Sequence, residues 1–167
     1  LGNHDNHKNF QAVFQTKLPS IKKIILSETW LIIAIDSTSI NKESGKITKQ
    51  QIHSLRKLIE DNKDKNLVLC LHHQPIKMGF WIDQVGLENS DQFIAAITNQ
   101  PNIKAVIWGH VHYESESRLE SIKMLSTPST CFQFYGNLEN PDTNRPGYRK
   151  INLFKSGKLE TKVIRID

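Results

Sequence analysis

The stretch NLVLCLHHQP, residues 66–75, decides the fold of this chain. Its first six residues form a nearly continuous apolar run, which is typical of a β-strand that is covered on both faces. Two histidines follow directly, at the point where this strand should end. In open α/β sheets, binding sites are usually built at the carboxyl ends of the strands. The stretch therefore predicts a buried strand at 66–71 that presents His72 and His73 to a site.

A second stretch, IKAVIWGHVH at residues 103–112, has the same organisation. A buried strand is predicted at 103–108, and Gly109 after it allows the chain to turn tightly. In extended backbone, side chains two positions apart point the same way. His110 and His112 could therefore both face a metal site.

The rest of the chain predicts an α/β fold. Thr48 and Gln51 fit a capping box, in which the two side chains satisfy backbone N–H groups at the start of a helix, and apolar residues then recur on one helical face. After residue 108 the pattern is mostly alternating, which indicates antiparallel strands with one wet face. Helices are predicted at 7–18, from Thr48 and at 89–99; strands at 21–27, 30–37, 115–120, 122–127, 129–135, 148–154 and 158–166; and a long loop at 137–147.

Composition narrows the class of protein. A chain of 167 residues is about one domain long, and its 38% hydrophobic and 23% charged residues are ordinary for a globular protein. The net charge of +5 is scattered, so we expect no nucleic-acid partner. Two cysteines make no disulfide framework, which favours the cytoplasm. Neither a signal peptide nor a stretch long enough to cross a membrane is visible.

A third motif, GNHD at residues 2–5, joins the two histidine stretches. Imidazole is the commonest metal-binding side chain, and its neutral form is available near pH 7. Histidine and asparagine with carboxylates suit divalent metals of the Zn, Mn or Fe kind. Three such motifs favour a metal site over isolated hydrogen-bonded histidines. His7 and His53 lie outside the motifs. His53 is expected to be solvated or packed on its helix, and His7 could line the site but is expected at the surface before a helix.

Together, GNHD, HHQP and GHVH resemble the motifs of the calcineurin-like metallophosphoesterases. FWIDQVGLEN (80–89), STPSTCFQF (126–134) and RPGYRKINL (145–153) resemble stretches of one branch, the bacterial class III 3',5'-cyclic AMP phosphodiesterases. The resemblance runs over nearly the whole chain. It implies part of a two-sheet α-β-β-α sandwich, and an enzyme that hydrolyses cyclic AMP to 5'-AMP with two divalent metals (Fe, Mn or Zn).

The resemblance also implies the metal ligands. Asn3 would bind the second metal through its side-chain oxygen, together with His72 and His110, and His112 would bind the first metal. His72 is preferred to His73 as the ligand because it directly follows the strand. His73 would lie behind the ligands or near the substrate.

Two residues of GNHD would carry the acid chemistry of such an enzyme. His4 would protonate the leaving oxygen of the cyclic nucleotide, and Asp5 would hold the imidazole in its orientation. General acid catalysis of this kind contributes roughly 10²–10⁴-fold to the rate.

Two motifs of the family pattern are not found ahead of Asn3 in this sequence. The family has an Asp-x-His motif and a Gly-Asp motif ahead of GNHD, and these supply the other ligands of the first metal and the bridging aspartate. Residues 1–167 are therefore expected to be the C-terminal portion of a single metallophosphoesterase domain whose N-terminal strands are missing. We expect partial metal occupancy at most and little activity from this portion. We also expect association through a sheet edge exposed near the 66–71 strand.

Two other functions stay open at this point. The protein could be another phosphodiesterase or phosphatase of the same superfamily, acting on glycerophosphodiesters or nucleic acid, because substrate choice resides in loops. It could also be a non-catalytic relative that binds a nucleotide or a protein partner.

Overall fold

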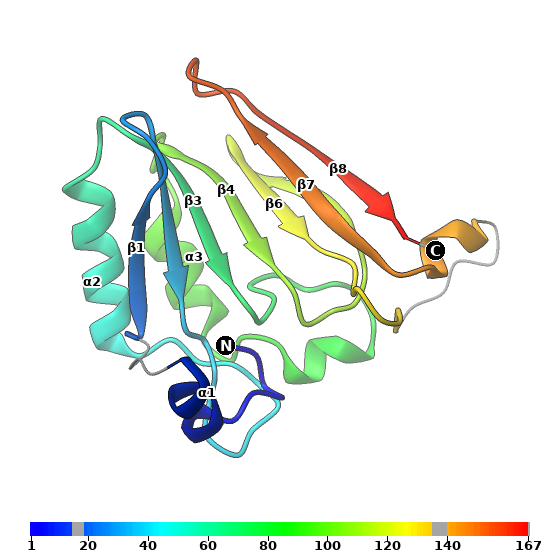
Figure 1. The fold of residues 1–167 in the computed structure, drawn as a ribbon. Coiled ribbons are helices and arrows are strands. Elements are labelled where there is room, and N and C mark those ends of the chain that lie inside the picture. The colour runs from blue at the N-terminus through cyan, green and yellow to red at the C-terminus, as the bar shows by residue number, and fades with distance from the viewer. Residues whose placement is uncertain (15–18, 135–139, 167) are drawn as a thin grey trace.

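The computed structural model describes residues 1–14, 19–134 and 140–166, which form a mixed six-stranded sheet with a two-stranded hairpin beside it (Figure 1). The order in the large sheet is β1-β2-β3-β4-β6-β5. Strands β2, β3, β4 and β6 are parallel, and β1 and β5 are antiparallel to their neighbours. The strands are β1 (Ile21–Ile25), β2 (Trp30–Ile35), β3 (Asn66–Leu71), β4 (Ile103–Trp108), β5 (Ser115–Leu119) and β6 (Ile122–Ser126).

Helices α2 (Lys49–Glu60) and α3 (Ser90–Ile97) cover one face of this sheet (Figure 1). The predicted capping box starts α2: the Gln51 amide donates to Thr48 Oγ1 at 3.2 Å, and the Thr48 amide donates to Gln51 Oε1 at 2.8 Å. The apolar side of each helix then packs on the strands. The shared core includes Leu31, Ile33, Leu55, Ile59, Leu69, Phe93, Ile97 and Val106.

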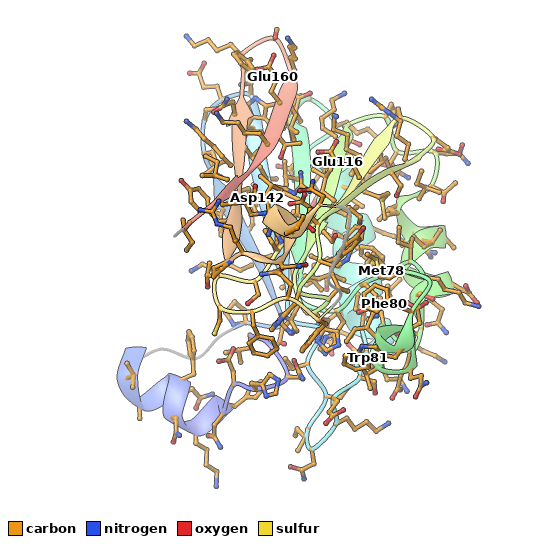
Figure 2. The ribbon with its side chains drawn as sticks, turned by 90° about the vertical axis from the view of Figure 1, so that its right-hand side faces the viewer. Met78, Phe80, Trp81, Glu116, Asp142 and Glu160 are labelled. Carbon is orange, nitrogen blue, oxygen red and sulfur yellow. The ribbon has the colours of Figure 1, made fainter. Side chains whose placement is uncertain are left out.

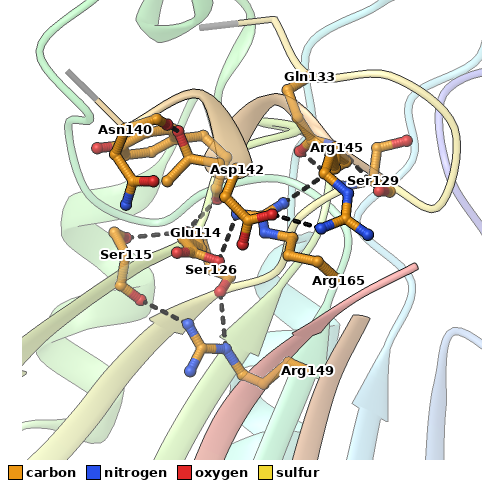
Figure 3. A network of polar contacts seen from close by, with 12 residues as sticks. Glu114, Ser115, Ser126, Ser129, Gln133, Asn140, Asp142, Arg145, Arg149 and Arg165 are labelled. Carbon is orange, nitrogen blue, oxygen red and sulfur yellow. Dashed lines mark hydrogen bonds and ion pairs between the residues drawn. The ribbon is translucent and has the colours of Figure 1, made fainter. Parts of the chain in front are cut away.

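The opposite face of the sheet packs against the hairpin of β7 (Gly147–Leu153) and β8 (Leu159–Arg165). Trp30, Val68 and Leu159 are buried in this second, smaller core. Polar contacts fix the hairpin to the large sheet: the buried guanidinium of Arg149 donates to the carbonyls of Ser126 (2.9 Å) and Ser115 (3.2 Å) (Figure 3). Two layers of strands, with helices on the outer face of the larger sheet, confirm the predicted α/β fold class.

The helix predicted at 7–18 begins as predicted in α1 (His7–Phe14), and its residues 15–18 lie outside the described residues. Other predicted boundaries are wrong. The strands predicted at 21–27 and 30–37 each end two residues earlier. The predicted loop 137–147 holds the short 3-10 helix η2 (Pro141–Asn144), and its residues 137–139 are not described.

The strand predicted at 129–135 is wrong over the described residues 129–134, which form a bend. The side chain of Gln133 explains it, because Gln133 Oε1 accepts from the Ser129 amide (3.1 Å) and Gln133 Nε2 donates to the Ser129 carbonyl (2.9 Å). The antiparallel pairs β5–β6 and β7–β8 agree with the prediction. However, β6 also pairs in parallel with β4, so it is buried rather than half wet.

The predicted exposed edge near residues 66–71 is also wrong. Strand β3 is paired on both sides, with β2 and β4. The outer strands of the large sheet are β1 and β5, and these carry Lys22, Lys23, Glu116 and Arg118. Charged side chains on outer strands disfavour pairing with other chains. Across the described ranges, every helix is too short or too polar to span a lipid bilayer.

Candidate metal centre

The three histidine-bearing segments meet at the carboxyl ends of the parallel strands. His72 and His73 follow β3, His110 follows β4, and the N-terminal segment lies beneath the arrowheads of these strands (Figure 1). The rings of the three histidines lie 4.7 to 5.0 Å apart. One ring nitrogen from each lies within 4.8 Å of the others, which makes the trio a candidate metal-binding cluster.

Asn3 contributes an oxygen atom to this cluster. Its Oδ1 lies 2.9 Å from His72 Nε2 and 3.3 Å from His110 Nδ1. These separations match those between neighbouring ligands of one metal, which are about 2.8–3.4 Å for metal–ligand bonds of about 2.0–2.1 Å in octahedral to tetrahedral geometry. The structure thus brings together the three side chains that were predicted to hold the second metal.

The preceding glycine makes this approach possible. A Cβ atom on Gly2 would lie 2.7 Å from Cε1 of His72, which is too close for any other residue without displacement. Asp5 closes the loop: its Oδ2 accepts from the Gly2 amide at 2.8 Å, and its own amide donates to the Gly2 carbonyl at 3.0 Å. GNHD therefore folds upon itself and holds the Asn3 side chain against His72.

The lone pairs at His110 fit a cation. Its Nε2 lies 3.1 Å from the Val85 carbonyl, which can only accept, so the proton resides on Nε2. Burial, reinforced by nearby histidines, lowers the pKa of His110 to about 4, so the ring is neutral at pH 7 and Nδ1 carries a lone pair. That lone pair faces the Asn3 oxygen, which is also an acceptor. A cation between these two atoms would satisfy both.

His72 is also neutral near pH 7. Burial lowers its pKa to about 3, and the neighbouring rings of His73 and His110 act in the same direction. Metals bind the neutral form of imidazole. The site therefore holds its histidines in the state that metal binding requires.

His73 has no ring nitrogen to spare. Its Nε2 donates to the Glu43 carbonyl at 3.0 Å, and its Nδ1 lies 2.9 Å from the Ser37 hydroxyl. The side chain is fully buried, and Gly45 packs so closely on the ring that a Cβ atom there would overlap it. This is the arrangement of a residue that supports the ligands from behind.

The backbone at GHVH is not extended as predicted. His110 and His112 have φ angles of 65° and 45°, in the left-handed region, where a non-glycine residue costs roughly 1–2 kcal/mol. His112 consequently lies apart from the three-histidine cluster. Its ring stacks on Phe134 at 4.1 Å, and its buried Nδ1 has no hydrogen-bond partner among the described atoms. His112 Nδ1 is therefore available as a ligand for a second cation.

His4 lies at the mouth of the site and is exposed. It lines a cavity of about 440 Å³ together with Asn3, His72, His110 and His112. Asp5 was predicted to orient the His4 ring, and the contact that the structure shows for its carboxylate is the bond from the Gly2 amide to Oδ2. A larger cavity of about 800 Å³ lies on the other side of His4, lined by residues 2–8 and 38–43.

The remaining histidines lie outside the cluster, as predicted. His53 is exposed on α2, and His7 is exposed with its Nε2 3.0 Å from the Thr38 hydroxyl. Asp5 and His7 have the Asp-x-His spacing, but they follow Asn3 rather than precede it. They therefore do not replace the family's first motif.

Aromatic side chains form the other side of the smaller cavity. Trp81, Phe132 and Phe134 line it, and we call these three residues the aromatic wall. None of them is among the predicted site residues. The only sequence signal was their position inside the two stretches that distinguish the cyclic-nucleotide branch, 80–89 and 126–134.

The fold and the site define the class of protein. It is an α/β protein whose histidines converge at the carboxyl ends of parallel strands. Within it, the chain belongs to the calcineurin-like phosphoesterase family, whose sequence profile matches residues 1–114.

Bacterial relatives match almost the whole chain. The 3',5'-cyclic adenosine monophosphate phosphodiesterase CpdA of Vibrio vulnificus is 30% identical over 169 residues, and that of Escherichia coli is 31% identical; each match covers 99% of this chain and 62% of the relative. A probable cyclic nucleotide phosphodiesterase of Colwellia psychrerythraea is 32% identical, over 99% of this chain and 65% of the relative. The chain thus spans less than two thirds of the length of these relatives.

Solved structures share the fold. A dimetal phosphatase from Danio rerio superposes with a TM-score of 0.55 at 11% identity, over 93% of this chain and 62% of that one. A protein from Thermus thermophilus superposes with a TM-score of 0.51 at 13% identity, over 93% and 63%. At these identities the likeness concerns the fold alone.

Proposed function

We propose that the protein carrying this chain hydrolyses the cyclic phosphodiester of 3',5'-cyclic AMP to give 5'-AMP, and that residues 1–167 form the C-terminal portion of its single phosphoesterase domain. The observation that carries the proposal is the convergence of Asn3, His72 and His110, whose ring nitrogens and amide oxygen lie at the separations of ligands around one divalent metal. The matches to bacterial cyclic nucleotide phosphodiesterases favour this substrate over other phosphate esters.

Two sets of ligands are proposed. Asn3, His72 and His110 would hold one metal, and His112 would contribute its unpartnered Nδ1 to the other. Fe, Mn and Zn all accept such nitrogen and oxygen donors. When bound, two such metals clamp the phosphoryl oxygens and lower the pKa of water.

His4 is proposed as the general acid. It is exposed at the mouth of the cavity that the metal ligands line, so a substrate can reach its ring. As imidazolium it would donate a proton to the 3'-oxygen while the bond from that oxygen to phosphorus breaks. Asp5 would act through the backbone, since its contact with Gly2 fixes the loop that carries His4.

The 167-residue chain by itself is proposed to be weakly active at best. The described cluster of metal-binding side chains consists of histidines, and no carboxylate among the described residues joins it. A two-metal phosphoesterase needs both metals to clamp the attacking and leaving oxygens. We therefore expect partial metal loading and slow turnover from this chain.

Hydrolysis assays with manganese test both statements. The full coding-length protein and the 167-residue chain are compared on cyclic AMP, cyclic GMP and bis-p-nitrophenyl phosphate. We expect the full-length protein to favour a cyclic nucleotide and the shorter chain to turn over far more slowly. A clear preference for a non-cyclic diester would contradict the proposed substrate. Equal rates from both forms would contradict the proposal that the 167-residue chain alone is weakly active.

A further inference from the structure

The aromatic wall stands beside the metal ligands in one cavity. Trp81 and Phe134 contact each other at 5.2 Å between ring centroids, and Phe132 lies 5.4 Å from Phe134. His112 joins the wall to the ligands, because its ring is parallel to that of Phe134 with an interplanar angle of 2°. A molecule held at Asn3, His72 and His110 would therefore extend along an apolar surface.

Trp81 begins the short 3-10 helix η1 (Trp81–Val85), and hydrogen bonds fix the loop that leads into this helix. Ile82, the next residue, is buried in the main core, and its carbonyl accepts from Gln74 Nε2 at 2.8 Å. The Asp83 carboxylate accepts from the amides of Met78 (2.7 Å) and Gly79 (2.9 Å) and so closes the loop. Figure 2 shows Met78, Phe80 and Trp81 together on this loop.

Phe132 is presented by the bend at 129–134. The two hydrogen bonds between Gln133 and Ser129 fix the bend, and the Cys131 amide donates to Ser129 Oγ at 3.0 Å. Phe132 and Phe134 flank Gln133 and both line the cavity. Two separate loops thus place aromatic rings on the same side of one cavity.

The exposure of these rings points to a ligand. Trp81 is 52% exposed and Phe132 is 55% exposed, whereas the two other tryptophans, Trp30 and Trp108, are almost completely buried. Exposing large aromatic rings to water is unfavourable, and a bound apolar surface would relieve that cost. A cavity of about 440 Å³ is within the usual range for small-molecule sites.

We propose that the aromatic wall is the base subsite of the enzyme, where Trp81 and Phe132 stack against the purine while the phosphate lies at the histidine cluster. The inference rests on the proposed function, because it assigns one part of that substrate to a surface. Stacking explains the chemistry of the wall, since every base offers a π-face to an aromatic ring. It makes Trp81 and Phe132 binding residues for the nucleotide.

Tryptophan fluorescence gives a readout that does not depend on turnover. Trp81 is the exposed member of the three tryptophans, so acrylamide should quench it selectively. With saturating manganese, we expect 5'-AMP to protect this emission from acrylamide and ribose 5-phosphate to leave it accessible. Trp81→Phe should remove the quenchable emission. Equal accessibility with 5'-AMP and with ribose 5-phosphate would overturn the proposal.

Affinity measurements test the two rings separately. We expect Trp81→Ala or Phe132→Ala to raise the Kd for 5'-AMP roughly 5- to 150-fold and to leave the Kd for ribose 5-phosphate within about twofold. Trp81→Phe should recover most of the affinity for 5'-AMP. Tyr148→Ala, at a comparably exposed aromatic residue of β7 that does not line the cavity, is the matched control.

The outcomes separate this inference from the proposed function. If the protein hydrolyses cyclic AMP but neither wall variant changes the Kd for 5'-AMP, the base subsite is wrong and the activity stands. If the wall variants weaken the binding of 5'-AMP alone but the full-length protein hydrolyses no cyclic nucleotide, the base subsite stands and the proposed activity is wrong. A loss of affinity for ribose 5-phosphate equal to that for 5'-AMP would mean that the rings only support the fold around the phosphate site.

Discussion

His72 Nε2 lies 2.9 Å from Asn3 Oδ1, although 69 positions separate the two residues in the chain. The contact is made possible by Gly2, which lies directly against the His72 ring. It joins the N-terminal segment to the end of β3 and defines where a metal would sit. Much of what the protein is proposed to do depends on this pair.

Replacing Asn3 with alanine should weaken metal binding. The substitution removes the one oxygen donor among the proposed ligands of this metal, and we expect a loss of affinity for Mn²⁺ of at least roughly 10- to 100-fold. Calorimetric titration with Mn²⁺ measures it. Asn152→Ala, at an exposed position of β7, is the control and should bind as the unchanged chain does. Equal affinities in all three proteins would remove Asn3 from the site.

Replacing His4 with glutamine should slow hydrolysis in a way that depends on the leaving group. A 3'-alkoxide needs a proton, so turnover of cyclic AMP by the full-length protein should fall roughly 10²–10⁴-fold. The p-nitrophenolate of bis-p-nitrophenyl phosphate leaves without one, so that substrate should lose far less. His53→Gln, on the exposed side of α2, is the matched histidine control. The same loss on both substrates would show that His4 is not the acid.

Acid should destabilise the fold through the buried histidines. The pKa of His72 is lowered from 6.5 to about 3 and that of His110 to about 4, mainly by burial. Between these values and 6.5 the unfolded chain binds protons that the folded chain does not, so stability falls as the pH falls through this window. Above 6.5 both rings are neutral in both states and contribute nothing to the pH dependence.

Urea unfolding in the presence of EDTA, at several pH values between 7.5 and 4.5, measures this effect. Each histidine contributes a slope of at most about 1.4 kcal/mol per pH unit. His72→Gln should therefore flatten the curve, and His53→Gln should leave it unchanged. A stability that is independent of pH below 6.5 would contradict the proposed neutral state of the cluster.

Replacing Arg149 with leucine should release the hairpin from the large sheet. The buried guanidinium also donates to Glu116 Oε1 (2.8 Å) and Thr161 Oγ1 (3.1 Å), so its loss would leave several acceptors without a partner. We expect a loss of about 3 kcal/mol in the free energy of unfolding. Arg118→Leu, at an exposed position of β5, should cost no more than about 0.5 kcal/mol. Similar unfolding midpoints for both variants would show that packing alone holds the hairpin.

The sequence was most informative where local patterns coincide with tertiary structure. The apolar runs at β3 and β4 and the capping box at Thr48 depend on short-range order, and all three are present as predicted. The bend at 129–134 could not be predicted, because alternating residues favour a strand unless a side chain such as Gln133 competes for the backbone.

At the site, the sequence predicted which residues take part more accurately than it predicted their geometry. The meeting of His72 with His110 follows from the parallel strands β3 and β4, which end together, and Asn3 joins them from the N-terminal segment. The left-handed backbone at His110 and His112 did not follow, because no glycine or asparagine marks those positions. The Asp5 contact with Gly2 was missed for a related reason: a short carboxylate can bond to a nearby amide as readily as to an adjacent ring.

The distance along the chain between the proposed ligands has a consequence for folding. Asn3 and His110 are 107 residues apart, and they meet only after β3 and β4 have paired in parallel. Contacts between such distant segments require closure of long loops and form slowly. The competence to capture a metal should consequently appear late during refolding, after most helical signal has returned. A metal-sensitive dye added during refolding would then measure when the sheet is fully assembled, rather than when the chain first becomes compact.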